Sequence, residues 1–168
     1  ENFVLTVNPV NDAPVINAVA ENLYTDEDES DTLSVSGSDV DHGTHNPGDE
    51  NILTFSAISS DTTLVKVEID NLGSGAGEGE IIFDVQQDQY GSADITVIIS
   101  DDGGLSDSTE TTLTIYPVND APVIATLQDT ITDEEVPLTI IFSASDVEDD
   151  PLTLSAVSDN ESVVVSID

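Results

Sequence analysis

The sequence predicts an all-β fold, arranged as β-sandwiches in tandem. Three observations predict it: apolar residues alternate with polar residues in many short runs, turn-forming residues separate these runs, and a long stretch of the sequence occurs twice. Alternation with a period of two places one face of a strand in a core and the other face in water. No window of the sequence carries the apolar stripe of a helix, so we expect strands throughout.

Six alternating runs stand out within the first copy of the repeat. They are Leu33–Val35, Leu53–Ala57, Val65–Ile69, Ile81–Phe83, Ile95–Ile99 and Leu113–Ile115. Glycine, aspartate, asparagine and serine separate the runs, as expected for turns. About seven short strands in about a hundred residues are typical of an Ig-like Greek-key β-sandwich.

The internal repeat predicts the domain organisation. Residues 7–16 recur as residues 115–124, and Thr25-Asp26-Glu27 recurs 107 residues later as Thr132-Asp133-Glu134. The offset falls to 99 residues between Leu53 and Leu152, so the first copy carries eight extra residues, in the loop 42–51. We expect residues 1–8 to be the last strand of a preceding repeat, residues 9–116 a complete repeat, and residues 117–168 the first half of the next. On this alignment neither end of the chain is a natural domain boundary.

The charge balance excludes several classes of partner. The chain has 36 acidic residues against Lys66 alone, a net charge of −35. Nucleic acid and anionic membranes both require basic contacts, so we expect neither as a partner. No apolar run approaches the ~18 residues of a membrane span, which argues against membrane insertion. Three explanations fit such an excess of acidic residues: bound divalent metal, a salt-rich habitat, or plain solubility.

No motif in the sequence indicates an enzyme. Cysteine is absent, and neither a nucleophile elbow nor a phosphate-binding loop is present. His42 and His45 lie in a loop with glycine and proline, which favours an exposed loop over a transition-metal site. We therefore expect a non-catalytic protein.

Acidic residues gather where the predicted strands end, and they recur in both copies. Asp39-Val40-Asp41 follows one strand and Asp101-Asp102-Gly103-Gly104 follows another, while Asp146-Val147-Glu148 repeats the first pattern. Calcium takes six to eight oxygen ligands from carboxylates, asparagine and backbone carbonyls. Each acid alone is an ordinary turn residue, but the recurring set indicates calcium. For the run 26–29, a solvated face is as good an interpretation.

These same residues carry a resemblance to cadherins. Asn11-Asp12-Ala13-Pro14 and Asn119-Asp120-Ala121-Pro122 look like the cadherin linker. Ser36–Gly43 looks like the cadherin Asp-Ala-Asp segment, and Ile98–Gly104 looks like the cadherin Ala-x-Asp-x-Gly segment. The sequence is most similar to bacterial cadherin-like repeats with Val-Asn-Asp-Ala-Pro at each boundary. The resemblance implies tandem cadherin-like sandwiches, a place in a large secreted adhesin or surface protein, and Ca²⁺ at each junction.

The resemblance also implies which residues hold the ions. At the first junction it implies Asn11, Asp12, Asp39, Asp41 and Asp101; at the second it implies Glu27, Asn119, Asp120, Asp146 and Glu148. Asp88 matches the family pattern poorly. Pro9 and Pro117 stand where the cadherin linker has aspartate, and Glu148 replaces the second aspartate of its segment. The sequence therefore predicts fewer ions at each junction than in animal cadherins.

Together these patterns predict a calcium-stabilised spacer of an extended extracellular protein, whose partners are calcium and the neighbouring repeats. Two alternatives stay open: a module that binds carbohydrate or another partner, and a subunit that assembles with like chains into a filament. Tyr24, Tyr90 and Tyr116 offer rings for sugar stacking, although scattered tyrosines more often pack against a fold. A salt-adapted sandwich without calcium sites is the plainest competitor.

Overall fold

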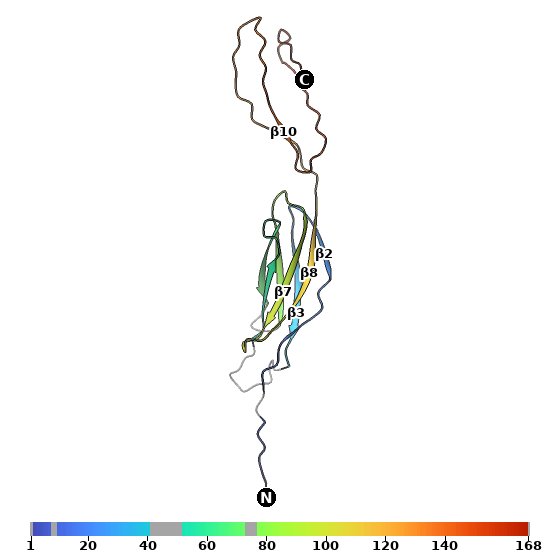
Figure 1. The fold of residues 1–168 in the computed structure, drawn as a ribbon, viewed down its shortest axis with the longest axis vertical. Coiled ribbons are helices and arrows are strands. Elements are labelled where there is room, and N and C mark those ends of the chain that lie inside the picture. The colour runs from blue at the N-terminus through green and yellow to red at the C-terminus, as the bar shows by residue number, and fades with distance from the viewer. Residues whose placement is uncertain (1, 8–9, 41–51, 73–76, 168) are drawn as a thin grey trace. The chain divides into compact units, whose positions relative to one another are not determined.

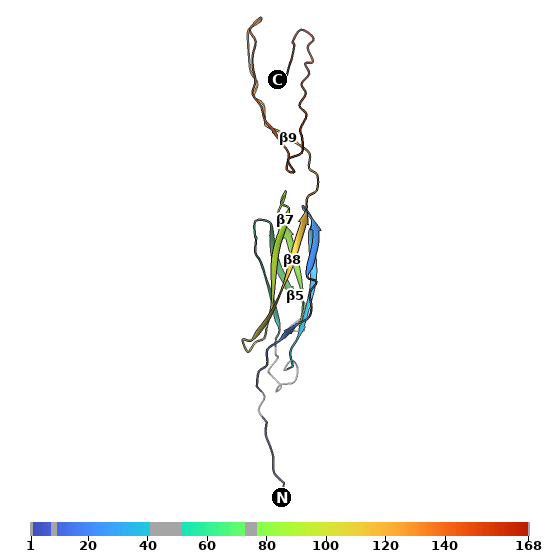
Figure 2. The same ribbon diagram turned by 45° about the vertical axis from the view of Figure 1, so that its right-hand side comes forward.

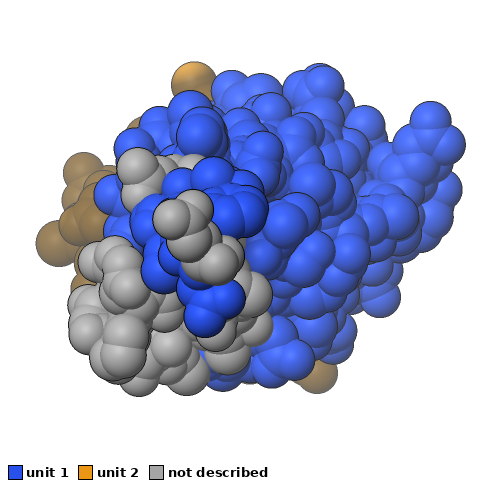
Figure 3. Space-filling view, turned by 90° about the horizontal axis from the view of Figure 1, so that it is seen from below, with its two compact units in different colours: residues 1–118 blue, residues 119–168 orange. Residues whose placement is uncertain are grey.

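The computed structural model describes residues 2–7, 10–40, 52–72 and 77–167. The chain divides into two compact units, Glu1–Val118 (unit 1) and Asn119–Asp168 (unit 2), which Figure 3 colours separately. All regular structure in these ranges is β-strand, and they hold no helix long and apolar enough to cross a membrane. The predicted all-β class is confirmed. Asp41 and the loop 42–51 lie outside the described residues.

Unit 1 is a sandwich of two four-stranded sheets (Figure 1). The first sheet has the order β1-β3-β6-β5, with strands Val15–Ile16, Ser30–Ser38, Glu78–Val85 and Val65–Asn71. The second has the order β2-β8-β7-β4, with strands Asn22–Asp26, Ser106–Tyr116, Gly91–Ser100 and Thr54–Ser59. Neighbouring strands are antiparallel, as β7 and β8 are in Figure 2, except that β2 runs parallel to β8.

The connections between strands give the Greek-key topology. The N-terminal segment changes sheets, since β1 pairs with β3 and β2 pairs with β8. The chain changes sheets again between β2 and β3, between β3 and β4, between β4 and β5, and between β6 and β7. This arrangement places β3, β6 and β5 opposite β4, β7 and β8, as in Ig-like domains. The predicted Ig-like sandwich is therefore confirmed.

The core lies between the two sheets of unit 1 and follows from the alternation of the sequence. Along β7, every second residue from Ala93 to Ile99 is buried. The buried apolar side chains of the unit are Val35, Leu53, Phe55, Leu64, Val65, Ile81, Phe83, Ala93, Ile95, Val97, Ile99, Leu113 and Ile115. Burying one such large side chain contributes about 1.5–3 kcal/mol, so this cluster is the main source of stability for unit 1.

Gly37 lets three strands meet at one end of the sandwich. A Cβ atom at this position would lie 2.4 Å from Cδ1 of Ile99 in β7 and 2.8 Å from the carbonyl oxygen of Val15 in β1. Only the absence of a side chain permits this approach of β3 to both strands. The segments that follow Ile99 and precede Val15 therefore emerge at the same end of unit 1, and these segments carry the predicted calcium ligands.

Unit 2 contains only one short antiparallel ribbon in its described residues, between β9 (Val123–Ile124) and β10 (Ala144–Ser145). In unit 1, β4 pairs only with β7 and β5 only with β6. The described part of unit 2 has no counterparts of β6 and β7, so the segments that repeat β4 and β5 stay unpaired. Ile131 and Val157 are 96% and 94% exposed. Residues 2–7 also form no strand.

Replacement of a core residue in β7 tests the packing of unit 1. Ile95 is completely buried, so Ile95→Ala removes buried apolar volume and should lower the free energy of unfolding by about 2–5 kcal/mol. Ile58 in the neighbouring β4 is 58% exposed, and Ile58→Ala should cost under about 1 kcal/mol. Urea unfolding followed by circular dichroism measures both values. Equal losses in the two variants would contradict the described core.

Candidate metal centre

At the end of unit 1 where Gly37 joins the strands, Asn11 and Asp101 are brought together from 90 residues apart. Nδ2 of Asn11 donates to Oδ2 of Asp101 at 2.9 Å, and the Leu105 N–H donates to Oδ1 at 2.7 Å. Gly103 makes room for this contact, because a Cβ atom there would lie 2.7 Å from three side-chain atoms of Asn11. The side chain of Asn11 also carries an amide oxygen, which is a neutral acceptor of the kind that calcium takes.

Asp101 is a buried carboxylate held in its charged form. It follows β7 directly and is 7% exposed. Burial raises the pKa of Asp101, but hydrogen bonds from Asn11 and from the backbone N–H groups of Leu105, Gly104 and Gly103 outweigh burial, so its pKa is lowered. A carboxylate of this kind is charged at neutral pH and suits a cation ligand.

Other predicted ligands of the first junction lie on nearby segments. Asp39 directly follows β3 and is half-buried, whereas Asp12 is exposed. A carboxylate that the sequence analysis did not single out also acts here: Oδ2 of Asp107 accepts the N–H of Ile16 at 3.0 Å. This bond ties β1 to the start of β8. No sequence signal distinguishes Asp107 from the exposed acids around it.

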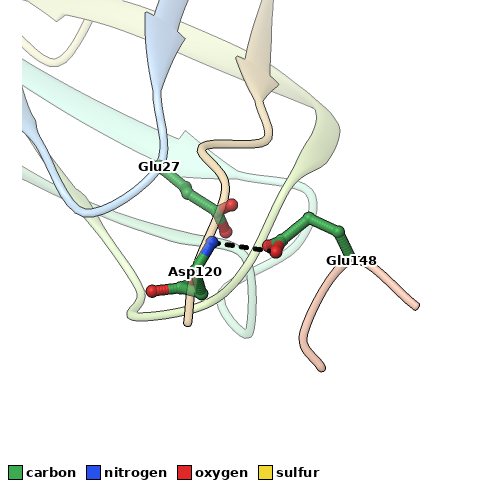
Figure 4. Close-up of side chains that lie close together, drawn as sticks. All are labelled: Glu27, Asp120 and Glu148. Atoms are coloured by element: carbon green, nitrogen blue, oxygen red, sulfur yellow. Dashed lines mark hydrogen bonds between the residues drawn. The ribbon is translucent and has the colours of Figure 1, made fainter. Parts of the chain in front are cut away.

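Glu27 lies at the opposite end of unit 1, in the turn after β2 (Figure 4). Its Oε1 accepts the N–H of Val118 at 2.8 Å, and its own N–H donates to the carbonyl of Tyr116 at 2.9 Å. Its side chain is 1% exposed. The backbone of Glu27 therefore continues the pairing of β2 with β8 by one residue beyond the end of β2. Burial also distinguishes Glu27 from its neighbours Asp26 and Glu29, which are exposed.

Asp28 and Asp88 meet at this same end of unit 1. Both have left-handed backbones, with φ values of 63° and 55°, and the Asp88 N–H donates to Oδ1 of Asp28 at 3.2 Å. Left-handed aspartates occur in tight turns. In the sequence, Asp28 is one member of the acidic run 26–29 and Asp88 matches the family pattern poorly, because the pairing of two turns 60 residues apart leaves no local pattern.

Within unit 2, a second set of predicted ligands is held by backbone donors. The Asp120 N–H donates to Oε2 of Glu148 at 3.0 Å (Figure 4). Oδ1 of Asp146 accepts the N–H groups of Glu148 and Asp150 at 3.2 and 3.1 Å. The other oxygen of Glu148, Oε1, is buried with no hydrogen-bond partner among the described residues. Asn119 is exposed, and its amide donates to the carbonyl of Asp120.

The structure thus gathers most of the predicted ligands into three groups of oxygen atoms. One group contains Asn11 and Asp101, and one contains Asp120, Asp146 and Glu148. The third consists of Glu27 and of Asp28 with its partner Asp88, in the turns at the opposite end of unit 1. Carboxylate and amide oxygens are hard ligands that suit calcium or magnesium rather than a thiophilic metal. The buried Oε1 of Glu148 is an acceptor that a bound cation would satisfy.

No family model and no curated protein sequence matches the chain. Among solved structures, domains 4 and 5 of the S-layer protein SbsC match with 16% identity and a TM-score of 0.42, over 65% of this chain and 54% of that one. The sialic acid binding region of a Streptococcus sanguinis adhesin matches with 15% identity and a TM-score of 0.45, over 64% and 30%. The cadherin-like resemblance therefore stays a hypothesis from the sequence.

Two further matches are to a titin domain and to an enzyme. Titin domain M7 matches with 15% identity and a TM-score of 0.40, over 64% of this chain and 98% of that one. An endo-fucoidan hydrolase of glycoside hydrolase family 107 matches with 15% identity and a TM-score of 0.44, over 62% of this chain but 14% of the enzyme. The chain spans about half of the SbsC fragment, and its fold assignment rests on its own strand pairing.

The lowered pKa of Asp101 predicts a specific pH dependence of stability without calcium. The folded pKa lies below the unfolded value of about 3.9, so the stabilisation is present above that value and is lost as pH falls through the folded pKa. In chelator at neutral pH, Asp101→Asn should unfold about 1–3 kcal/mol more easily than wild type. In urea unfolding from pH 7 to pH 3, this difference should shrink below about pH 4.

The matched control is Glu68→Gln, which neutralises an exposed carboxylate in the middle of β5. It should leave the stability close to wild type at each pH. A difference between Asp101→Asn and wild type that stays constant across the whole pH range would contradict the role given to the charged carboxylate.

Proposed function

We propose that this chain is a non-catalytic structural repeat of an extended extracellular protein and that calcium stabilises the ends of its repeats. The observation that carries the proposal is a recurrence: similar oxygen-bearing residues occur at matching positions of both copies, and in each unit a linker residue is hydrogen-bonded to a carboxylate farther along the chain. Asn11 bonds Asp101 in unit 1, and Asp120 bonds Glu148 in unit 2.

At the first end of unit 1, calcium would be held by Asn11, Asp39 and Asp101. The carboxylate of Asp101 is buried and kept charged, and the amide oxygen of Asn11 supplies a neutral ligand beside it. Bound calcium would neutralise carboxylates that otherwise repel one another in a chain of net charge −35. The resemblance assigns two more ligands, Asp12 and Asp41, to this first junction.

At the boundary between the copies, a short segment would carry ligands for both. Glu27 binds the N–H of Val118, the last residue of unit 1, and Asp120 follows only two residues later in the chain. The resemblance to cadherin-like repeats assigns Asn119, Asp146 and Glu148 to the same junction as Glu27. Pro117 and Pro122 bracket this segment, and the fixed φ of proline limits its freedom to swivel. Calcium would fix the segment further.

A calcium-dependent spacer suits an extracellular protein because of its affinity range. Extracellular modules bind calcium with dissociation constants of about 10⁻⁴–10⁻³ M. A site of that kind fills outside a cell and stays largely empty inside it. At ten to a hundred times the dissociation constant, each ion adds about 1.4–2.7 kcal/mol of stability.

The alternative function is a module that binds carbohydrate, another protein or like chains through the loops at one end. This alternative has the same β-sandwich fold, but in it the acidic residues keep the protein soluble and do not bind calcium. A melt that calcium leaves unchanged, together with specific retention on a glycan array or self-assembly in solution, would favour this alternative.

Loss of one carboxylate should weaken the response to calcium. Calcium chloride should raise the unfolding free energy of wild type by about 1.4–2.7 kcal/mol for each ion bound, beyond sodium chloride of equal ionic strength. In Asp101→Asn the gain in unfolding free energy should be smaller by about the contribution of one ion, because a charged ligand of that ion is lost. Gly103→Ala should act in the same direction, since its Cβ displaces the side chain of Asn11.

Thermal melts in calcium, in chelator and in sodium chloride measure these gains, and calorimetric titration counts the ions. Glu68→Gln is the matched control and should keep the full gain, because its exposed carboxylate lies in the middle of β5. Identical melts in all three solutions would overturn the proposal. If calcium stabilised wild type and Asp101→Asn equally, the proposed calcium site at the end of unit 1 that carries Asp101 would be wrong.

A further inference from the structure

Two exposed tyrosines lie side by side on the outer face of unit 1. The ring centroids of Tyr24 in β2 and Tyr116 in β8 are 6.0 Å apart, and the ring planes differ by 9°. The parallel register pairs Tyr24 with Thr114 and Asp26 with Tyr116, so both rings project from the same face. The rings remain 58% and 49% exposed, so they are not core residues.

The tyrosine pair forms one wall of a cavity of about 440 Å³ at the edge of the sandwich. The cavity also takes in Asp26 from β2, Glu29 from the turn after it, and Asp31 from β3 in the other sheet. Its volume falls in the ordinary range of small-ligand sites, about 300–1,000 Å³. We call this cavity, with its two rings and three carboxylates, the tyrosine groove.

The chemistry of the tyrosine groove selects a positively charged ligand. All three of its charged residues are acidic and exposed, in a chain of net charge −35, so an anionic ligand would be repelled. Aromatic faces attract cations through the ring quadrupole, and carboxylates add charge-assisted hydrogen bonds. A neutral sugar would also stack on the rings and donate its hydroxyl hydrogens to the carboxylates, but only a cation gains in addition from their negative charge. A metal ion would gain nothing from the two rings.

We propose that the tyrosine groove binds an organic cation, namely an alkylammonium or guanidinium group, between the rings of Tyr24 and Tyr116 and the carboxylates of Asp26, Glu29 and Asp31. Two sources present this chemistry: a free polyamine, and a lysine or arginine side chain of a partner protein. The site is distinct from the calcium ligands proposed above, and its function does not depend on them. It gives an otherwise structural repeat a means to hold a basic partner.

The test is a calorimetric titration of the full chain in saturating calcium chloride and at constant ionic strength. The probes are spermidine, a short acetylated and amidated peptide of lysine and arginine, and the neutral disaccharide maltose. Spermidine or the peptide should bind and maltose should not. Because the chain has three tyrosines and no tryptophan, its intrinsic fluorescence should also change on binding. Preference for spermidine identifies a free amine as ligand, and preference for the peptide identifies a basic side chain.

Variants separate a built site from general attraction to an acidic protein. Tyr24→Leu and Tyr116→Leu should each raise the dissociation constant about two- to fivefold, the range expected for loss of one exposed cation–π contact. Phe3→Leu removes a ring that is 89% exposed but does not line the groove, and it should change nothing. Asp26→Asn should weaken binding, whereas Glu68→Gln, which removes an equal charge elsewhere, should not. Thermal melts confirm that each variant is folded.

Three results would overturn the proposal. Equal affinity in the wild type and both tyrosine variants would mean that the cations bind only through the net charge. Binding of maltose without binding of either cation would assign the rings to a carbohydrate. Loss of cation binding when calcium saturates the protein, with recovery in chelator, would make the three carboxylates calcium ligands.

Discussion

The folding of this chain depends on how it accommodates carboxylates without basic partners. The chain has 36 acidic residues and a single basic one, Lys66, whose ammonium group donates to Oε1 of Gln86 at 2.8 Å. Ion pairs therefore cannot neutralise the acids, and backbone N–H groups and amide side chains serve instead. Many acids avoid the difficulty by lying exposed in turns and loops or on the outer positions of strands. The few buried ones are each held by such donors, and these donors determine where the ends of the sandwich lie.

Two buried carboxylates connect segments that are far apart in the sequence. Asp101 joins the loop after β7 to Asn11, and Glu27 joins the turn after β2 to the backbone at Val118. Each bond spans about 90 residues, so each closes the sandwich at one end. A buried charge costs free energy unless it is hydrogen-bonded, and here the hydrogen bonds also fix the chain at its entry to and exit from unit 1. The same geometry concentrates negative charge at the two ends, where a divalent cation would relieve it.

The sequence predicts much of the fold because period-two alternation is strong in unit 1. The alternation from Ile95 to Ile99 and from Leu113 to Ile115 identifies β7 and β8, although β8 begins earlier than its apolar residues indicate. The split of the N-terminal segment into β1 and β2 was not predictable, since its parallel pairing with β8 is a long-range contact. The grouping of Asn11 with Asp101 was implied by the cadherin-like resemblance. The meeting of Asp28 with Asp88 and the tyrosine groove depend on register between distant strands, which no single window of sequence records.

The two units show which parts of the repeat form locally and which need the whole sandwich. Unit 2 keeps the turn in which Asp146 accepts two backbone N–H groups and the bond from Asp120 to Glu148, although it has no buried apolar cluster among its described residues. These contacts span at most 28 residues, so they need few other strands. The contacts of Asp101 and Glu27 require β7, β8 and β2 in place, because the bonded residues come from opposite ends of the sequence of unit 1. The ligand group of unit 2 is therefore a local property of its sequence, whereas both ligand groups of unit 1 depend on the completed core.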